Sequence, residues 1–333
     1  MLGCWSLKQP PVIMSEAPTV RILPSIQSWL PGSVNDLCRD IRERVPEIHI
    51  EPIEYVDQPT ADLSEADILI TNHVSEDVLD RAENLKWLQV LSSGVAKYPL
   101  DQLRADDVLL TNASGVHAEP IAEQVLGYIL LFERRLLDAI AQQDRREWRR
   151  HSGREIQGRT LGVVGLGKVG RQVAERAAAL DLDVIGTKRT ALEIESVSDV
   201  YEPDKLGTVL ARSDYVVLTC PLTPETRGLI RTPEYEAMQS DTILINVARG
   251  PITPEDELVD AIRSRRIRGA AIDVFESEPL TVDSPIWDLP NVVVTPHSAG
   301  TTPRYLARCA DIFAENYHHF TRGRPEEMPN RVL

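Results

Sequence analysis

The fold is decided by one stretch, Thr160-Leu161-Gly162-Val163-Val164-Gly165-Leu166-Gly167-Lys168-Val169-Gly170. Its apolar start is typical of a buried strand, and a helix is expected from Lys168 to Leu180. Glycines spaced G-x-G-x-x-G between a strand and a helix form the dinucleotide fingerprint. The first permits a tight turn, the second lets the backbone approach a pyrophosphate, and the third lets helix and strand pack closely. We therefore predict that a dinucleotide coenzyme binds at Gly165, Leu166, Gly167, Lys168, Val169 and Gly170.

The residues that end the next strand, Asp183 to Thr187, indicate which coenzyme this is. An NAD site usually has a carboxylate there, which holds the ribose hydroxyls. This chain has Thr187, Lys188, Arg189 and Thr190 instead. Lysine and arginine can pair with a 2′-phosphate that a carboxylate would repel. We therefore predict a site for NADP(H), with NAD(H) as the alternative if these residues form only a solvated turn.

Strands alternate with helix-sized segments around the fingerprint. Six strands are predicted, at residues 161–164, 183–187, 215–218, 242–246, 269–273 and 292–295. This alternation predicts an α/β fold with a Rossmann-type doubly wound parallel sheet. Ahead of it, apolar side chains recur at helical spacing from residue 119 to about 146, which predicts one long helix with a stripe for the core or for an oligomer interface. The arginine-rich segment around Trp148 suits an arm that packs on a partner subunit.

The amino-terminal part predicts a second, smaller α/β unit with a mainly parallel sheet and no phosphate loop of its own. Two of its loops follow strands, at the edge where open α/β sheets bind ligands. The first contains Asn72 and His73, of which His73 is most simply a solvated loop histidine. The second, Ser93-Gly94-Val95, contains a glycine turn that can aim backbone N–H groups at a carboxylate. We predict substrate binding at Asn72, Ser93, Gly94 and Val95.

Three further polar residues follow strands of the larger sheet. Arg249 lies just past one strand, Glu278 past the next, and His297 past the last. Because the carboxyl ends of parallel strands share one edge, a cation, an acid and an imidazole could converge on the coenzyme cleft. Each residue alone has a simpler interpretation, as a surface salt bridge, a loop residue before proline, and a buried histidine, respectively.

Composition limits the classes of partner. The 333 residues have a formal net charge of −15, with 36 basic residues, of which six are Lys, against 51 acidic ones. This balance opposes nucleic-acid binding, which needs basic groups for the phosphates. An acidic, lysine-poor surface suits concentrated salt, and a GC-rich genome gives the same arginine bias, so a halophilic adaptation stays open.

The sequence also bears on compartment and on the start of the chain. It has no run of about 18 apolar residues, so no membrane partner is expected. The four cysteines show no metal-type spacing and fit a reducing, cytoplasmic compartment. Residues 1–18 are expected to form a disordered leader, with Met14 as an alternative start to Met1.

Four motifs, in this order, resemble the D-isomer-specific 2-hydroxyacid dehydrogenase family. They are the glycine turn at 165–170, Leu-Ile-Asn-Val-Ala-Arg-Gly at 244–250, Asp-Val-Phe-x-x-Glu-Pro at 273–279 and Thr-Pro-His-Ser-Ala at 295–299. The resemblance implies a discontinuous, flavodoxin-like substrate-binding domain at 19–111 and 299–333 and a dinucleotide-binding domain at 112–298. It also implies a homodimer formed through the coenzyme domain, and it requires no metal.

The resemblance implies a role for each site residue. His297 would be the general acid/base for the keto oxygen, Glu278 would orient and stabilise its imidazolium, and Arg249 would clamp the substrate carboxylate and polarise the carbonyl. Ser93, Gly94 and Val95 would be the main-chain carboxylate loop, and Asp273 the partner of the nicotinamide amide. Further coenzyme contacts are implied for Cys220, Pro221, Thr226, Val247, Ala248, Ala299 and Gly300.

Two departures from the usual family motifs indicate which branch of the family the sequence resembles. Lys188-Arg189 resembles the NADP-using glyoxylate and hydroxypyruvate reductase branch, and the acid at Glu278 differs from the Gln of formate dehydrogenases. We therefore predict NADPH-dependent reduction of small 2-ketoacids to D-2-hydroxy acids. Pyruvate, branched ketoacids, glyoxylate and hydroxypyruvate all stay open as substrates. The alternatives are an NAD-dependent biosynthetic dehydrogenase, such as a short phosphoglycerate dehydrogenase, and a corepressor-like, redox-sensing binding protein.

Overall fold

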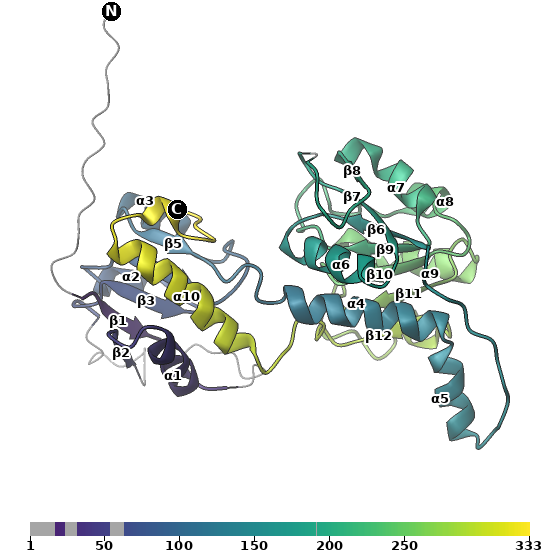
Figure 1. Cartoon of the computed structure of the whole chain (residues 1–333), viewed down its shortest axis with the longest axis horizontal. Coiled ribbons are helices and arrows are strands. Elements are labelled where there is room, and N and C mark those ends of the chain that lie inside the picture. Colours follow the sequence, from purple (N-terminus) through teal and green to yellow (C-terminus); the bar gives the residue numbers. More distant parts are fainter. Residues whose placement is uncertain (1–16, 24–31, 54–62, 191) are drawn as a thin grey trace, which may run out of the picture. The chain divides into compact units, whose positions relative to one another are not determined.

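The computed structural model describes residues 17–23, 32–53, 63–190 and 192–333, so nearly all of the expected leader lies outside the described residues. The chain divides into two compact units (Figure 1). Unit 1 combines Met1–Val116 with Thr302–Leu333, and unit 2 is His117–Thr301. The chain thus passes between the units a few residues beyond the predicted junctions at 111 and 298. Both units are α/β, which confirms the predicted fold class.

Unit 1 contains a five-stranded parallel sheet in the order β2-β1-β3-β4-β5. This is the flavodoxin-like order, in which ligands bind at the carboxyl ends of the strands where the order reverses. The strands are β1 (Thr19–Ile22), β2 (His49–Pro52), β3 (Ile68–Thr71), β4 (Trp87–Val90) and β5 (Leu109–Thr111). β3 and β4 are buried on both faces, which explains their continuous apolar runs.

The end of the chain returns to complete unit 1. Its last long helix packs against α1, and the Phe313 ring stacks on Trp87 of β4 at 5.1 Å between centroids. Ser33 is the N-cap of helix α1 and exchanges capping hydrogen bonds with Asp36. The helices of unit 1 are α1 (Val34–Arg44), α2 (Glu76–Arg81), α3 (Leu100–Ala105), α10 (Tyr305–Thr321) and the 3-10 turn η4 (Pro325–Glu327).

Unit 2 contains a seven-stranded parallel sheet in the order β12-β11-β10-β9-β6-β7-β8. The order reverses between β6 and β9, as in the doubly wound dinucleotide fold. Its strands are β6 (Thr160–Val164), β7 (Asp183–Thr187), β8 (Asp199–Tyr201), β9 (Tyr215–Leu218), β10 (Ile243–Asn246), β11 (Gly269–Ile272) and β12 (Val292–Val294). The prediction of six strands missed β8, a three-residue edge strand that pairs with β7.

Helices cover both faces of this sheet, so successive strand residues enter different cores. Val163 packs in a cluster with α4 and α6, whereas Val164 packs in a cluster with α7, α8 and α9. The helical elements are α4 (Ala118–Glu133), α5 (Leu136–Asp144), α6 (Lys168–Ala178), α7 (Leu206–Arg212), α8 (Thr232–Ala237), α9 (Glu255–Arg263), η1 (Pro203–Lys205), η2 (Gly250–Ile252) and η3 (Pro285–Asp288).

The prediction of one long helix from residue 119 to about 146 is wrong. The helix breaks after Glu133, and Arg135 has a left-handed backbone with φ of 54°. The polypeptide then enters α5. The described parts of the protein bury none of the α5 side chains. Figure 1 shows α5 extending beyond the rest of unit 2.

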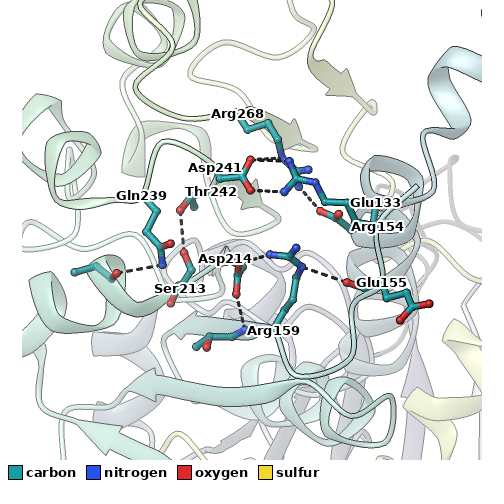
Figure 2. A network of polar contacts seen from close by, with 12 residues as sticks. Glu133, Arg154, Glu155, Arg159, Ser213, Asp214, Gln239, Asp241, Thr242 and Arg268 are labelled. Atoms are coloured by element: carbon teal, nitrogen blue, oxygen red, sulfur yellow. Dashed lines mark hydrogen bonds and ion pairs between the residues drawn. The ribbon is translucent and has the colours of Figure 1, made fainter. Parts of the chain in front are cut away.

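Polar side chains join the amino ends of the unit 2 strands (Figure 2). Asp214, just before β9, accepts hydrogen bonds from the Arg159 guanidinium at 2.6 Å and from the Thr160 amide at 2.8 Å. The carboxylate of Asp241, before β10, pairs with both terminal nitrogens of Arg154. Arg268, before β11, pairs with the fully buried Glu133. We call Glu133, Arg154, Arg159, Asp214, Asp241 and Arg268 the amino-edge network.

Candidate active site

The glycine turn after β6 has the geometry of a phosphate-binding loop. Gly165 has a φ of +105°, which favours glycine, and a Cβ there would lie 2.7 Å from the backbone nitrogen of Cys220. A Cβ on Gly170 would lie 2.3 Å from the carbonyl oxygen of Gly165. A Cβ on Gly167 would meet no described atom within 4 Å, so the backbone is open where α6 begins. These residues fit a pyrophosphate at a helix N-terminus.

The end of β7 lies against this turn. The Thr187 hydroxyl accepts a hydrogen bond from the Gly165 amide at 3.2 Å, and the Leu166 amide donates to the Thr187 carbonyl. The Lys188 ammonium donates to the Leu166 carbonyl at 3.2 Å, which places it on the turn itself. Arg189 and Thr190 are exposed. Two cations therefore stand at the end of β7, where an NAD site would have a carboxylate.

Arg249 follows β10 in a turn fixed by Asn246. The Asn246 side chain accepts a hydrogen bond from the Ala248 amide and donates to the Arg249 carbonyl, at 3.0 and 3.1 Å. The next residue, Gly250, presses on the chain after β11, because a Cβ there would lie 2.0 Å from the carbonyl carbon of Phe275. The exposed Arg249 side chain is thereby held beside the loop that carries Glu278, whose pKa it helps to lower.

Glu278 and His297 form a hydrogen-bonded pair. His297 Nδ1 lies 2.7 Å from one Glu278 carboxylate oxygen, and the other oxygen accepts the Phe275 amide at 3.0 Å. Burial alone would raise the pKa of Glu278, but the bonds from His297 and from the Phe275 amide hold it below its usual range. Because the carboxylate stays ionised, Nδ1 carries the proton, and Nε2 is the nitrogen that can exchange a proton with a substrate.

Asp273 holds the turn on which His297 lies. His297 has a left-handed backbone with φ of 49°, a strained conformation for a residue other than glycine. One Asp273 carboxylate oxygen accepts the Thr295 hydroxyl at 2.5 Å and the Ser298 amide at 2.9 Å, and the other accepts the Ala299 amide at 3.0 Å. The Asp273 carbonyl accepts the His297 amide at 2.8 Å. A carboxylate has about four acceptor positions, so one stays available for a ligand amide.

The other predicted coenzyme residues lie on loops that follow strands of the same sheet. Cys220 follows β9, and its burial raises the pKa of the thiol to about 11, so the thiol is neutral. The Thr226 hydroxyl donates to the Pro221 carbonyl at 2.7 Å and closes that loop. Val247 and Ala248 are buried after β10, and Ala299 is buried after β12. The Gly300 carbonyl lies 2.9 Å from the ring of His117, which precedes α4.

The predicted substrate residues lie together in unit 1. Asn72 is buried after β3, and Ser93 and Gly94 are exposed after β4. The Tyr98 hydroxyl joins the two loops, because it donates to the Asn72 carbonyl at 2.8 Å and lies 3.0 Å from the Ser92 hydroxyl. The Tyr98 amide also donates to the Val95 carbonyl.

Sequence reasoning did not single out several residues that shape these sites. Asn246 and Gly250 lie within the motif from which only Val247, Ala248 and Arg249 were assigned roles, and Thr295 lies within the motif around His297. Tyr128 contacts Thr295 from α4, across a separation of 167 residues, so no local pattern could have found it. An asparagine at the end of a buried strand was the one available signal, because such a side chain needs partners.

Comparisons with known proteins agree on one family. Residues 126–299 match the family described as "D-isomer specific 2-hydroxyacid dehydrogenase, NAD binding domain". A D-3-phosphoglycerate dehydrogenase of Methanocaldococcus jannaschii is 32% identical, covering 87% of this chain and 57% of the relative. A glyoxylate reductase of Thermofilum pendens is 34% identical, covering 80% and 79%. A D-isomer-specific 2-hydroxyacid dehydrogenase of Xanthobacter autotrophicus, solved with NADPH and MES, superposes with a TM-score of 0.79 at 30% identity, covering 96% and 98%.

The described residues contain neither a membrane-spanning helix nor a metal-binding cluster. None of the described helices is both long enough and apolar enough to cross a membrane. Across the described ranges, no cluster of three or more His, Cys, Asp or Glu side chains is arranged to hold a metal ion.

Proposed function

Because the chain belongs to the D-isomer-specific 2-hydroxyacid dehydrogenase family, we propose that it reduces small 2-ketoacids to D-2-hydroxy acids with NADPH. The observation that carries the proposal is the Glu278–His297 pair, with Arg249 beside it. These three residues follow β10, β11 and β12, on the sheet edge that also bears the glycine turn. A proton donor, its anionic partner and a carboxylate-binding cation are what reduction of a 2-ketoacid requires.

In this reaction His297 is the acid. A bound nicotinamide coenzyme would supply the hydride for the keto carbon. As charge develops on the keto oxygen, His297 transfers a proton to it from Nε2, and Glu278 stabilises the imidazolium before that transfer. Arg249 binds the substrate carboxylate and polarises the carbonyl, which favours the charge that develops in the transition state.

The coenzyme preference rests on the end of β7. We assign the pyrophosphate to residues 165–170 and the 2′-phosphate to Lys188 and Arg189, with Thr187 and Thr190 beside them. The Lys188 ammonium is already held on the glycine turn, so it needs little reorganisation to bind a phosphate. NADH stays the alternative coenzyme. In unit 1 we assign the substrate carboxylate to the backbone of Ser93, Gly94 and Val95, with Asn72 near the substrate side chain.

Similarity to D-3-phosphoglycerate dehydrogenases favours a second candidate, the NAD-dependent oxidation of D-3-phosphoglycerate. The deciding measurement is kcat/KM for NADPH and NADH with glyoxylate, hydroxypyruvate, pyruvate and a branched ketoacid, alongside D-3-phosphoglycerate with either oxidised coenzyme. NADPH-dependent turnover of an unphosphorylated ketoacid supports the proposal. Turnover confined to phosphoglycerate and NAD supports the second candidate, and tight coenzyme binding with no turnover overturns both.

We further propose a homodimer formed through unit 2. Leu136 and Ile140 of α5 are 44% and 54% exposed, and Trp148 beyond it is 93% exposed. A nine-residue helix is marginal by itself in water, so α5 needs another surface to pack on. A second copy of this chain presents the same apolar stripe and can cover it symmetrically.

The mass of the protein in solution tests this assembly. Ile140→Asp combined with Leu136→Asp should convert the dimer to a monomer in light scattering, because each change places a charge in the interface. Asp144→Asn, a change at an exposed residue at the end of α5, is the matched control. A wild-type monomer at micromolar concentration would refute the dimer.

We also propose a cytoplasmic location and tolerance of concentrated salt. Among the described residues, Cys38, Cys220 and Cys309 are buried free thiols, as expected in a reducing compartment. The net charge of −15 supports solubility in salt. Activity and folded state should persist in molar KCl, and loss of either would rule out salt adaptation.

A further inference from the structure

The Tyr128 side chain of helix α4 forms a hydrogen bond at the turn of His297. The Tyr128 hydroxyl lies 2.5 Å from the Thr295 hydroxyl, and Thr295 lies 2.5 Å from the Asp273 carboxylate. Thr295 has a single hydroxyl proton, which it donates to Asp273, so Tyr128 is the donor in the first bond. The three groups form a directed chain from α4 to the carboxylate that holds the His297 turn.

The hydrogen bonds that run from Tyr128 to Asp273 are suited to hold the His297 turn in one position. Tyr128 is only 3% exposed, and its burial raises the pKa of the phenol, so the hydroxyl keeps its proton. Its donated bond fixes the rotation of the Thr295 hydroxyl toward Asp273. Asp273 then accepts the Ser298 and Ala299 amides, the two that follow His297. Hydrogen bonds in such a chain strengthen one another, so removal of the first weakens the rest.

The strained backbone of His297 makes this support relevant. A left-handed residue other than glycine persists only when its surroundings determine it. Most of the described bonds that hold this turn go to Asp273, beside one from the His297 amide to the Thr295 carbonyl and the ring's bond to Glu278. A looser turn would let the imidazole leave the position in which it pairs with Glu278.

We propose that Tyr128 is a positioning residue, which holds His297 in its working orientation through Thr295 and Asp273. The inference rests on the proposed function, in which His297 donates the proton. It goes further in assigning part of the reaction rate to a helix that contributes no group to the reacting atoms. The simpler interpretation is that Tyr128 is a core side chain and that its hydroxyl bonds to Thr295 only because a buried hydroxyl needs a hydrogen-bond partner.

The first test is Tyr128→Phe, which keeps the ring and removes the donor. Loss of one hydrogen bond predicts a kcat lower by about two- to ten-fold, with the KM of the ketoacid nearly unchanged. The matched control is Tyr235→Phe, which removes a fully buried hydroxyl that has no hydrogen-bond partner among the described residues. The control should keep wild-type kcat. Wild-type kcat in Tyr128→Phe, or an equal loss in both variants, would overturn the proposal.

A double-mutant cycle tests whether the effect passes through Thr295. Thr295→Val removes the bridging hydroxyl at nearly constant shape, and Thr295→Ser restores it. Once Thr295→Val is present, Tyr128→Phe should change kcat no further, because the chain is already interrupted. Thr295→Ser should keep most of the wild-type kcat. Additive losses would show that Tyr128 does not act through Thr295.

Amide hydrogen exchange separates this inference from the proposed reaction. In Tyr128→Phe the Ser298 and Ala299 amides should exchange about two- to ten-fold faster than in the wild type, and in Tyr235→Phe they should not. If the wild-type protein turns over no ketoacid but shows this pattern, the proposed function fails and the support of the turn stands. Unchanged exchange in Tyr128→Phe refutes the support.

Discussion

The two edges of the unit 2 sheet are built from similar polar residues in opposite ways. At the amino edge, Arg154 and Asp241 form a two-bonded ion pair, and these bonds hold the pKa of Asp241 below its usual range. At the carboxyl edge, His297 has a strained backbone and a half-exposed ring, and Arg249 is exposed. The amino edge pairs Arg154 with Asp241, whereas the carboxyl edge leaves the Arg249 side chain exposed beside the Glu278–His297 pair.

The difference teaches where to look for chemistry in a parallel sheet. Charged residues at both edges follow or precede buried strands, so position in the sequence does not distinguish them. What distinguishes the carboxyl edge is the strained backbone of His297 and the hydrogen bonds that Asp273 accepts from the residues that follow it. If the distinction is correct, substitutions at the carboxyl edge should lower turnover and leave stability unchanged. Substitutions at the amino edge should lower stability and leave turnover unchanged.

The largest effect is expected for His297→Ala. Removal of the proton donor should lower kcat by about 10²- to 10⁴-fold, the usual contribution of general acid catalysis. The midpoint of thermal unfolding should stay near that of the wild type, because the side chain is half exposed. His297→Asn serves as a control, since asparagine tolerates the left-handed backbone. Wild-type turnover in either variant would remove His297 from the mechanism.

The opposite edge is tested by Arg268→Met. This change leaves the Glu133 carboxylate, which is fully buried, without its cation, and should lower the free energy of unfolding by about 3 kcal/mol. Denaturant unfolding measures the loss, and kcat at low temperature should not change. Adding Glu133→Leu should recover much of the stability, because it removes the uncompensated charge. If Arg268→Met lowered kcat and kept the stability of the wild type, the proposed difference between the two edges would be wrong.

Glu278→Gln sharpens the contrast through pH. The pKa of Glu278 is lowered, so its charge is fully present at neutral pH and is lost as pH falls through that lowered value. Loss of the Glu278 charge should therefore lower the kcat/KM of the wild type only in acid. The glutamine variant should be about 10- to 100-fold slower near neutral pH, the range expected for one charged hydrogen bond. An unchanged pH profile would mean that Glu278 does not act on His297.

The smallest expected effect concerns coenzyme choice. Lys188→Asp with Arg189→Ala should lower the ratio of kcat/KM for NADPH to that for NADH by about ten-fold or more, because a carboxylate repels the 2′-phosphate. Stability should change little, since Arg189 is exposed and the Lys188 side chain makes a single hydrogen bond to the Leu166 carbonyl. An unaltered ratio would place the 2′-phosphate elsewhere in the molecule.

Much of the fold could be predicted from the sequence, and the family resemblance is confirmed. Buried parallel strands are continuous apolar runs, which are easy to recognise. Strand β8 was missed because its three residues are only partly buried. The break between α4 and α5 was missed because its left-handed position is Arg135, where a glycine or an asparagine usually stands.

The residues of the candidate site could be predicted from the sequence. The hydrogen bonds that hold these residues in place could not. The trio and the glycine turn lie in local motifs, which a single sequence displays, although their assigned roles stay predictions. The support of the His297 turn joins α4 to the loop after β12, and such contacts follow only from three-dimensional packing. A tyrosine within a helical apolar stripe looks like any other core residue until its hydroxyl is placed.

The arginine-rich segment that follows α5 also bears on how long the protein survives in a cell. Arg145, Arg146, Arg149 and Arg150 lie in exposed chain, next to a helix with little packing to protect it. Exposed, weakly packed segments are the preferred sites of proteolytic cleavage, and a protease that cuts after arginine would find four such bonds here. If a second copy covers this arm, unassembled chains would be degraded first, and the cell would keep mainly the assembled protein.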